Sequence, residues 1–371
     1  MNKLHVILIL LVSISFFSCE TDVDVIAEYK DITIVYGIIN PGETTHYLKI
    51  NKAFLGSGNA LDLASDAGNS NYPDGELEII VQAFNENGTV KETYSTAEGT
   101  VVKSVDEIVK DPGIFDSDLN VLYKFEEASI NRNYTYKLKI INNKLDKEIS
   151  TETTIVNSSS VSNPSTISKF QFWNSDLSDA DSYMNKTFVL TTGADIGRVG
   201  LALFFNYTQH YTLASGKAST THLVKMSLID VQTTKPTGGE ELSWTLEGET
   251  FFENISSTVS SPASVTDFSH RELKNISLEF LIAGTELNTF MEVNAPSSSV
   301  NQNQPGYTNI TNGLGIFSSR ESMYWESDID PETQNQVNIN DLTIAKLGAM
   351  NLGFCFGSAG IGFPKAPCQQ L

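Results

Sequence analysis

The chain has 371 residues, with 45 acidic against 24 basic side chains and a formal net charge of −21 at pH 7. So acidic a surface repels phosphate backbones and anionic head groups, which argues against nucleic acid as a partner and against direct adhesion of the polypeptide to lipid. At 40% hydrophobic and 10% aromatic residues the chain can build packed cores, and its length predicts two domains.

Residues 1–18, MNKLHVILILLVSISFFS, have the form of a secretory signal. Lys3 gives a positive start, and the apolar core of about 14 residues is shorter than the roughly 20 that span a bilayer. The ending FFSC resembles a bacterial lipobox, although Phe16 stands where leucine is commoner. We therefore predict lipidation of Cys19, which anchors the chain in a membrane. The alternative is a plain secreted protein with an incidental cysteine.

An acidic tether is predicted at 19–30, where Glu20, Asp22 and Asp24 follow the cysteine. A charge run of this kind is often a solvated tether and nothing more. It also resembles the export signal of Bacteroidota lipoproteins, which carries them to the cell surface. That resemblance implies an outer-membrane lipoprotein that faces the cell exterior.

The first domain, 31–156, is predicted to be an immunoglobulin- or fibronectin-like β-sandwich. Short apolar or alternating segments, separated by turn signals, predict strands at 31–40, 46–54, 76–84, 89–96, 119–126, 134–142 and 147–156. In NYTYKLKI, Tyr134, Tyr136, Leu138 and Ile140 alternate with polar residues, which indicates one buried and one solvated face. A tyrosine in such a strand is typical of the corner of a fibronectin-type domain.

Residues 157–166, NSSSVSNPST, are polar and are predicted to be a linker. The second domain, 167–371, is predicted to be a larger antiparallel β-sandwich or barrel-like sheet with one or two short helices. Its strands are expected at 186–193, 198–212, 221–234, 241–254 and 273–284. A helix capped by Thr285 is expected to bury Leu287, Phe290 and Met291, and a second helix is expected near the end of 330–350.

No motif indicates a catalytic residue, a metal centre or a cofactor, and we predict none of the three. His210 and His222 lie on neighbouring predicted strands and could face each other, but two histidines without a third ligand make a poor zinc site. His46 and His270 belong to no motif either. An irregular calcium site is the alternative, with two candidate acid sets: Asp328, Asp330 and Glu332, and Asp62, Asp66 and Asp74.

Cys355 and Cys368 form an even pair once Cys19 is set aside, and in an oxidising compartment such a pair predicts a disulfide. The alternative is two free thiols. Tyr324 and Trp325 lie between charged residues in ESMYWESD, so we predict that this pair is exposed and contacts a ligand such as a glycan.

Two further stretches, ITIVYGIINPGETTHYLKINKAF and YTNITNGLGIF at 307–317, together with the acid-tailed lipobox, resemble a family of uncharacterised Bacteroidota outer-membrane lipoproteins that carries a domain of unknown function. In the second stretch we expect Gly313 and Gly315 to serve a tight turn or close strand packing. The resemblance implies genes that often neighbour TonB-dependent outer-membrane receptors, and it implies no reaction.

These observations predict a non-enzymatic surface lipoprotein that serves as an accessory or binding component of an outer-membrane receptor or transporter. Its expected partners are the outer membrane, through the lipid anchor, a TonB-dependent β-barrel, and a glycan or small nutrient. One alternative is a structural or assembly component of envelope, secretion or motility machinery. Another is a carbohydrate-active enzyme, which requires a cleft with two carboxylates roughly 5–10 Å apart.

Overall fold

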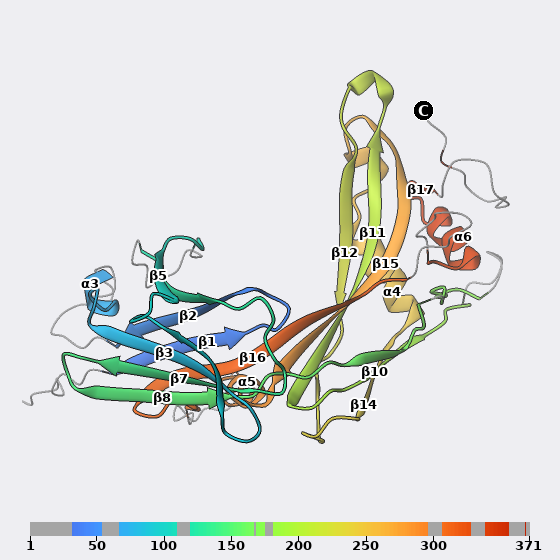
Figure 1. The fold of residues 1–371 in the computed structure, drawn as a ribbon. Helices are drawn as coiled ribbons and strands as arrows, with labels where there is room; N and C mark the ends of the chain where they lie inside the picture. The colour runs from blue at the N-terminus through green and yellow to red at the C-terminus, as the bar shows by residue number, and fades with distance from the viewer. Residues whose placement is uncertain are drawn as a thin grey trace, which may run out of the picture.

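The computed structural model describes residues 32–53, 67–109, 119–166, 168–174, 181–295, 306–327, 338–355 and 368. Within these ranges the chain is all-β with a few short helices, as the alternation of apolar and polar residues predicts. Figure 1 shows two arms: a sandwich that lies flat and a tall, curved sheet that rises from its end. No helix in the described ranges is long and apolar enough to cross a bilayer.

The flat arm is a sandwich of two sheets, with strand orders β16-β1-β2-β6-β5 and β4-β3-β7-β8. Its first-half elements are β1 (Thr33–Ile39), β2 (Thr45–Lys52), α3 (Ala67–Ser70), β3 (Leu77–Phe84), β4 (Val90–Ser95), β5 (Val101–Val105), β6 (Val121–Glu126), β7 (Thr135–Asn142) and β8 (Lys147–Thr153). All seven predicted strands are present. Strand β5 was not predicted, because only Val101 of its five residues is buried and no alternation marks it.

Strand β7 shows the predicted two faces. Tyr136, Leu138 and Ile140 are at most 1% exposed, and Tyr134 packs against the same core from its rim. The hydroxyl of Tyr136 accepts a hydrogen bond from the backbone N–H of Asn131 at 3.2 Å, which is the corner contact expected of a fibronectin-type strand.

A strand from the C-terminal third of the chain completes this sandwich. The first half of β16 (Gly313–Trp325) pairs in parallel with β1, from Thr33 opposite Gly313 to Ile39 opposite Ser319. Ile310 and Phe317 enter the sandwich core. The unit predicted at 31–156 therefore also contains residues 313–319, a long-range pairing that no local pattern reveals.

The upright arm, which we call the blade, continues the same sheet through the second half of β16. Its strand order is β12-β11-β15-β16, with β11 (Ile196–Tyr211), β12 (Thr220–Ser227) and β15 (Phe268–Gly284). Two short strands join its edges: β13 (Val231–Gln232) pairs with β11, and β17 (Phe354–Cys355) pairs with β15. Because β11 and β15 have 16 and 17 residues, they extend for roughly 50 Å at about 3.3 Å per residue.

A small sheet covers the inner face of the blade, in the order β14-β10-β9. It comprises β9 (Ser160–Asn163), β10 (Lys186–Thr191) and β14 (Glu241–Leu246). Trp244 of β14 meets Phe280 of β15 edge to face, with ring centroids 5.8 Å apart. The second half is therefore a sandwich of unequal sheets.

Three predicted elements differ from the structure. The predicted strand 221–234 is divided into β12 and β13, with residues 228–230 between them. The predicted linker 157–166 contains β9, which forms an edge strand beside β10 and points Val161 toward the core. The predicted strand 241–254 ends at Leu246, and α4 (Gly248–Thr258) follows. The helix forms because Phe251, Phe252 and Ile255 fall on one helical face, and all three are buried.

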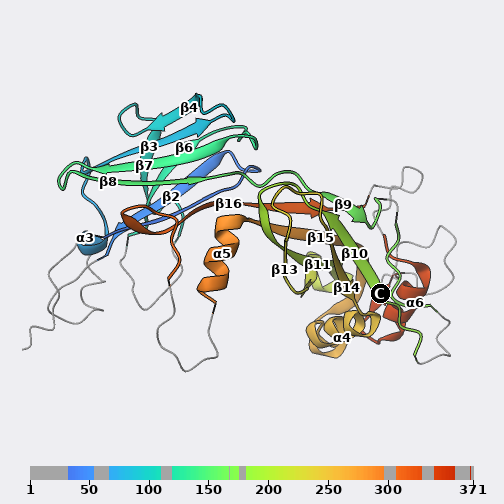
Figure 2. The same cartoon turned by 90° about the horizontal axis from the view of Figure 1, so that it is seen from below.

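The other helices are α5 (Thr285–Val293), α6 (Asp341–Ala349) and the single turns η1 (Leu213–Ser215) and η2 (Pro262–Ser264). Figure 2 shows β16 running from the sandwich toward the blade, with α5 beside it. Gly284 rather than Thr285 is the N-cap of α5, and none of its residues is fully buried, so the expected burial of Leu287, Phe290 and Met291 is wrong. Helix α6 lies where the second helix was predicted, capped by the Asn340 side chain.

Candidate functional site

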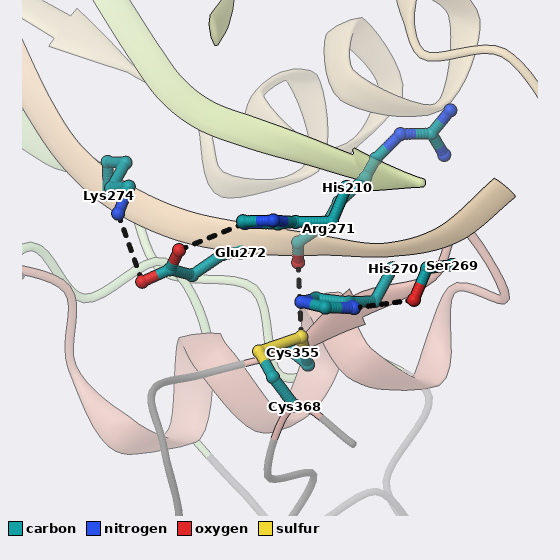
Figure 3. The surroundings of a disulfide bond; sticks show 8 residues. All are labelled: His210, Ser269, His270, Arg271, Glu272, Lys274, Cys355 and Cys368. Atoms are coloured by element: carbon teal, nitrogen blue, oxygen red, sulfur yellow. Dashed lines mark hydrogen bonds and ion pairs between the residues drawn. A yellow bond between two sulfur atoms is a disulfide. The ribbon is translucent and has the colours of Figure 1, made fainter. Parts of the chain in front are cut away.

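The strongest concentration of chemically active side chains in the described residues lies on the outer face of the blade. His210 of β11 pairs with His270 of β15, and Glu272 of β15 pairs with Cys355 of β17. Because side chains alternate along a strand, His270 and Glu272 share one face and Arg271 points to the other. We call His210, His270, Glu272, Cys355 and Cys368 the histidine–disulfide cluster (Figure 3).

The two imidazole rings of this cluster stack with centroids 4.4 Å apart and planes inclined by 14°. His210 Nε2 lies 3.1 Å from Glu272 Oε2, and the hydroxyl of Ser219 lies 2.8 Å from His210 Nδ1. The hydroxyl of Ser269 lies 2.9 Å from His270 Nδ1. Each ring is therefore held by at least one polar neighbour and by the other ring.

Burial, and then the charge of His210, lower the pKa of His270 below its ordinary value. Burial acts to raise the pKa of Glu272, but the hydrogen bonds and charges of Lys274 and His210 outweigh it and bring that pKa below its ordinary value. At neutral pH the cluster consequently holds an ionised Glu272 beside a neutral His270.

Behind the cluster, Arg271 is only 1% exposed and fixes the strands in place. Its Nε donates to Gln209 Oε1 at 3.1 Å, and its Nη1 donates to the carbonyl oxygen of Leu352 at 2.5 Å. The guanidinium also lies 4.9 Å from the ring centroid of Phe268. The Leu352 contact ties the segment that leads into β17 to β15, so it positions Cys355.

Cys355 and Cys368 form a disulfide, with Cα atoms 5.0 Å apart. One ligand atom each from His270, Cys355 and Cys368 lie within 4.8 Å of one another. The sequence pointed to the cysteine pair, but nothing in it indicated that His270 would lie beside that pair.

His210 and His222 do not face each other, although the sequence left that arrangement open. His222 pairs with Tyr207 instead, and the two rings stack with centroids 5.3 Å apart. The register between β11 and β15 shifts between Phe205 and Tyr207 and again between His210 and Tyr211. The sequence marks neither irregularity. His46 is 2% exposed and packs against Phe125, away from the blade.

Of the pair predicted to be exposed, Tyr324 is exposed and Trp325 is buried. Tyr324 is 68% exposed and donates a hydrogen bond to Glu279 Oε1 at 2.9 Å, whereas Trp325 is 7% exposed and meets Phe170 edge to face at 5.7 Å. Consecutive residues of a strand point to opposite faces, so the two side chains cannot share a ligand surface. Of the pair, only Tyr324 is placed to contact a ligand.

Most of the remaining predicted site residues lie outside the described residues. This holds for Cys19 with its export signal Glu20, Asp22 and Asp24, and for the calcium candidates Asp62, Asp66, Asp328, Asp330 and Glu332. Asp74 is described: its carboxylate accepts from Lys103 Nζ at 2.5 Å, and this contact lowers its pKa. Asp74 borders an open depression on the sandwich that also includes Glu78, Tyr123 and Asn143.

Gly313 and Gly315 serve close strand packing. A Cβ atom on Gly313 would lie 2.8 Å from the Thr33 carbonyl oxygen, and the approach at Gly315 is closer still. The two glycines let β16 lie against β1.

No protein-family model matches this chain, and comparison with curated proteins finds no match. Among solved structures, E. coli alpha-2-macroglobulin in its native conformation is similar, at 9% sequence identity and a TM-score of 0.21. The match covers 70% of this chain and 17% of that chain, so this chain spans less than a fifth of the solved protein. A likeness at that TM-score carries no argument about fold or function.

Proposed function

We propose that this protein is a surface-exposed outer-membrane lipoprotein, anchored through Cys19, that acts as a non-enzymatic accessory of a TonB-dependent outer-membrane receptor. The anchor and the orientation rest on the lipobox and on the acids that follow it. The choice of a TonB-dependent receptor as the partner rests on the family resemblance. The blade supplies the surface that contacts this partner.

The observation that carries the proposal is the free edge of the blade. Among the described residues, β12 pairs only with β11, so the far side of its backbone has no strand partner. An unpaired edge of eight residues is a template for a strand of another protein. Exposed apolar side chains flank it: Leu213 is 79% exposed, Leu223 55% and Ile229 81%.

Charge defines the occupant of this edge. The chain has a net charge of −21, yet residues 196–229, which form the whole β11–β12 hairpin, contain no Asp or Glu. Arg198, Lys217 and Lys225 lie in the same stretch. An acidic, partly apolar segment of the receptor is therefore repelled by most of the protein and accepted here.

A photo-crosslinking residue in place of Leu223 tests the proposal in whole cells, with the same residue in place of Leu145 as control. Leu145 is 47% exposed and lies in the turn between β7 and β8 of the sandwich. We expect Leu223 alone to capture a TonB-dependent barrel, and Lys225→Glu to reduce that capture at least about tenfold. Capture of secretion or motility components would favour the assembly alternative, and equal capture from both positions would refute the edge as the binding surface.

The anchor has its own test. Cys19→Ser is expected to move the protein from the outer-membrane fraction to a soluble fraction, and protease added to intact cells is expected to degrade the wild-type protein. Retention of the variant in the membrane would remove the lipid anchor from the proposal. Full protection of the wild type from protease would place it on the inner leaflet.

A further inference from the structure

We propose that the histidine–disulfide cluster is a latent metal site: when the disulfide is reduced, Cys355, Cys368 and His270 together bind one zinc ion. The inference concerns a different surface from the partner edge on β12. It stands whether or not the proposed receptor role is correct.

Geometry is the first support. In a tetrahedral zinc site, bonds of about 2.3 Å to sulfur and about 2.0 Å to nitrogen place neighbouring ligand atoms roughly 3.5–3.8 Å apart. The three candidate atoms already lie within 4.8 Å of one another. His270 and Cys355 are on the adjacent strands β15 and β17, and Cys368 is bonded to Cys355. Beyond breakage of the bond between the two sulfurs, the site therefore needs only a small adjustment.

The orientation of His270 is the second support. Its Nδ1 is engaged by the Ser269 hydroxyl at 2.9 Å, and Figure 3 shows the other ring nitrogen on the side of the cysteine sulfurs. Metal-binding histidines commonly have their second nitrogen fixed by such a neighbour, which sets the ring orientation. Stacking on His210 holds the plane of the ring as well.

The donor set selects the metal. Two thiolates and one imidazole suit zinc, whereas calcium and magnesium require oxygen ligands. A water molecule completes the fourth position. Glu272 is already engaged by Lys274 at 3.0 Å and by His210.

The chemistry balances with a dithiol as reductant. Thiol–disulfide exchange transfers two electrons and two protons from the dithiol to the protein, which yields two cysteine thiols and one oxidised dithiol. Zinc then binds both sulfurs as thiolates, together with neutral His270, and releases two protons. The zinc ion then links Cys355 to Cys368, as the disulfide did before reduction.

The test uses the full-length lipoprotein purified in detergent, with cobalt as a spectroscopic substitute for zinc. We expect the reduced protein to bind one equivalent of cobalt, with sulfur-to-metal charge transfer and the intense visible bands of tetrahedral cobalt. Zinc should displace the cobalt. The protein with its disulfide intact should show neither band.

His270→Ala is the decisive variant because it leaves both cysteines and the disulfide in place. We expect it to weaken cobalt binding by more than about tenfold, with Ser269→Ala weakening it less. His222→Ala is the matched control, since it removes a stacked histidine from the same blade and should bind cobalt as the wild type does. The proposal is overturned if reduced wild type binds no cobalt, if His270→Ala binds it normally, or if the disulfide form binds it equally.

Discussion

Gly315 of β16 lies so close to Val35 of β1 that a Cβ atom on Gly315 would fall 1.9 Å from the Val35 carbonyl oxygen. Gly315 also has a φ of +111°, a backbone conformation that residues other than glycine rarely adopt. The two residues are directly paired in the parallel ladder. Entry of the C-terminal strand into the N-terminal sandwich therefore depends on a glycine at this position.

Gly315→Ala is expected to destabilise the protein by at least about 3 kcal/mol, because the clash and the backbone strain act together in a fully paired strand. Urea unfolding followed by tryptophan fluorescence measures the change. Gly306→Ala is the control: no atom lies within 4 Å of its added Cβ, so the cost should stay below about 0.5 kcal/mol. Similar costs at both positions would contradict the packing role of Gly315.

A second prediction concerns the ion pair that joins the two arms. Arg132, just before β7, donates through Nη1 to Glu321 Oε2 at 2.9 Å and through Nη2 to Glu321 Oε1 at 2.5 Å. Its Nη1 also donates to the Val156 carbonyl oxygen at 2.7 Å. Glu321 lies in β16 where this strand has left β1 and pairs with β15. Arg132→Met should therefore cost about 2 kcal/mol of unfolding free energy, because it leaves the largely buried Glu321 without its charged partner.

The control for this pair is Lys139→Met. Lys139 lies 2.8 Å from Glu148, but their side chains are 44% and 56% exposed. Removing so exposed an ion pair should cost less than about 0.5 kcal/mol. Thermal unfolding compares the two variants, and limited proteolysis shows whether Arg132→Met loosens the junction first. Equal losses of stability would mean that Arg132 and Glu321 do not join the arms.

The period of two along the chain was enough to predict most of this fold. Tyr136, Leu138 and Ile140 alternate with polar neighbours in sequence and are buried together in the structure. The same rule, applied to neighbours, would have separated Tyr324 from Trp325. Charged flanking residues were a weaker signal than strand alternation, since a strand can carry charges on one face and bury its other face.

Long-range pairing was beyond local patterns. The parallel ladder of β1 and β16 joins residues near 35 to residues near 315, and the two glycines that allow it were visible in the sequence without their partners. The histidine–disulfide cluster was hidden for a similar reason. His270 faces His210 only because of the register that β15 takes beside β11 after a bulge.

A third prediction follows from His46, which is 2% exposed and whose two ring nitrogens have no hydrogen-bond partner. Burial lowers the pKa of His46 below its ordinary value of 6.5. It outweighs the nearby Glu127 backbone and the charges of Glu43 and Glu127, which act to raise that pKa. The unfolded state therefore takes up a proton first as the pH falls. The stabilising contribution of neutral His46 is fully present above the pKa of the unfolded state. It declines as the pH drops from about 6.5 toward the lower pKa of the folded state.

His46→Phe keeps an aromatic ring beside Phe125 and cannot be protonated. We expect the variant to lose less stability than the wild type between pH 7 and pH 5, measured as the urea midpoint at each pH. The two proteins should differ least in their response to pH above 7, where the wild-type imidazole is neutral in both states. A parallel decline of both proteins between pH 7 and pH 5 would show that His46 does not govern acid sensitivity.

The last prediction concerns Glu286, in the first turn of α5, whose Oε2 atom is buried without a hydrogen-bond partner. Burial raises the pKa of this carboxyl above its ordinary value of 4.5, and the charges of Asp195 and Glu152 also act to raise it. They outweigh the hydrogen bonds from the Glu286 backbone and Thr153, which act to lower it. The folded state holds the proton at a pH where the unfolded state has released it. Stability is therefore greatest near or below pH 4.5 and declines as the pH rises through the folded pKa, after which ionised Glu286 destabilises the fold.

Glu286→Gln has nearly the same shape and no charge, so it should raise the melting temperature at pH 8 and change it little at pH 4. Glu292→Gln, at an exposed position of the same helix, should change it little at either pH. Calorimetry of the three proteins at both pH values measures the melting temperatures. It distinguishes relief of a buried charge from a change in packing or helix propensity. A gain that is equal at pH 4 and pH 8 would come from packing or helix propensity, because relief of a buried charge can appear only where that charge exists.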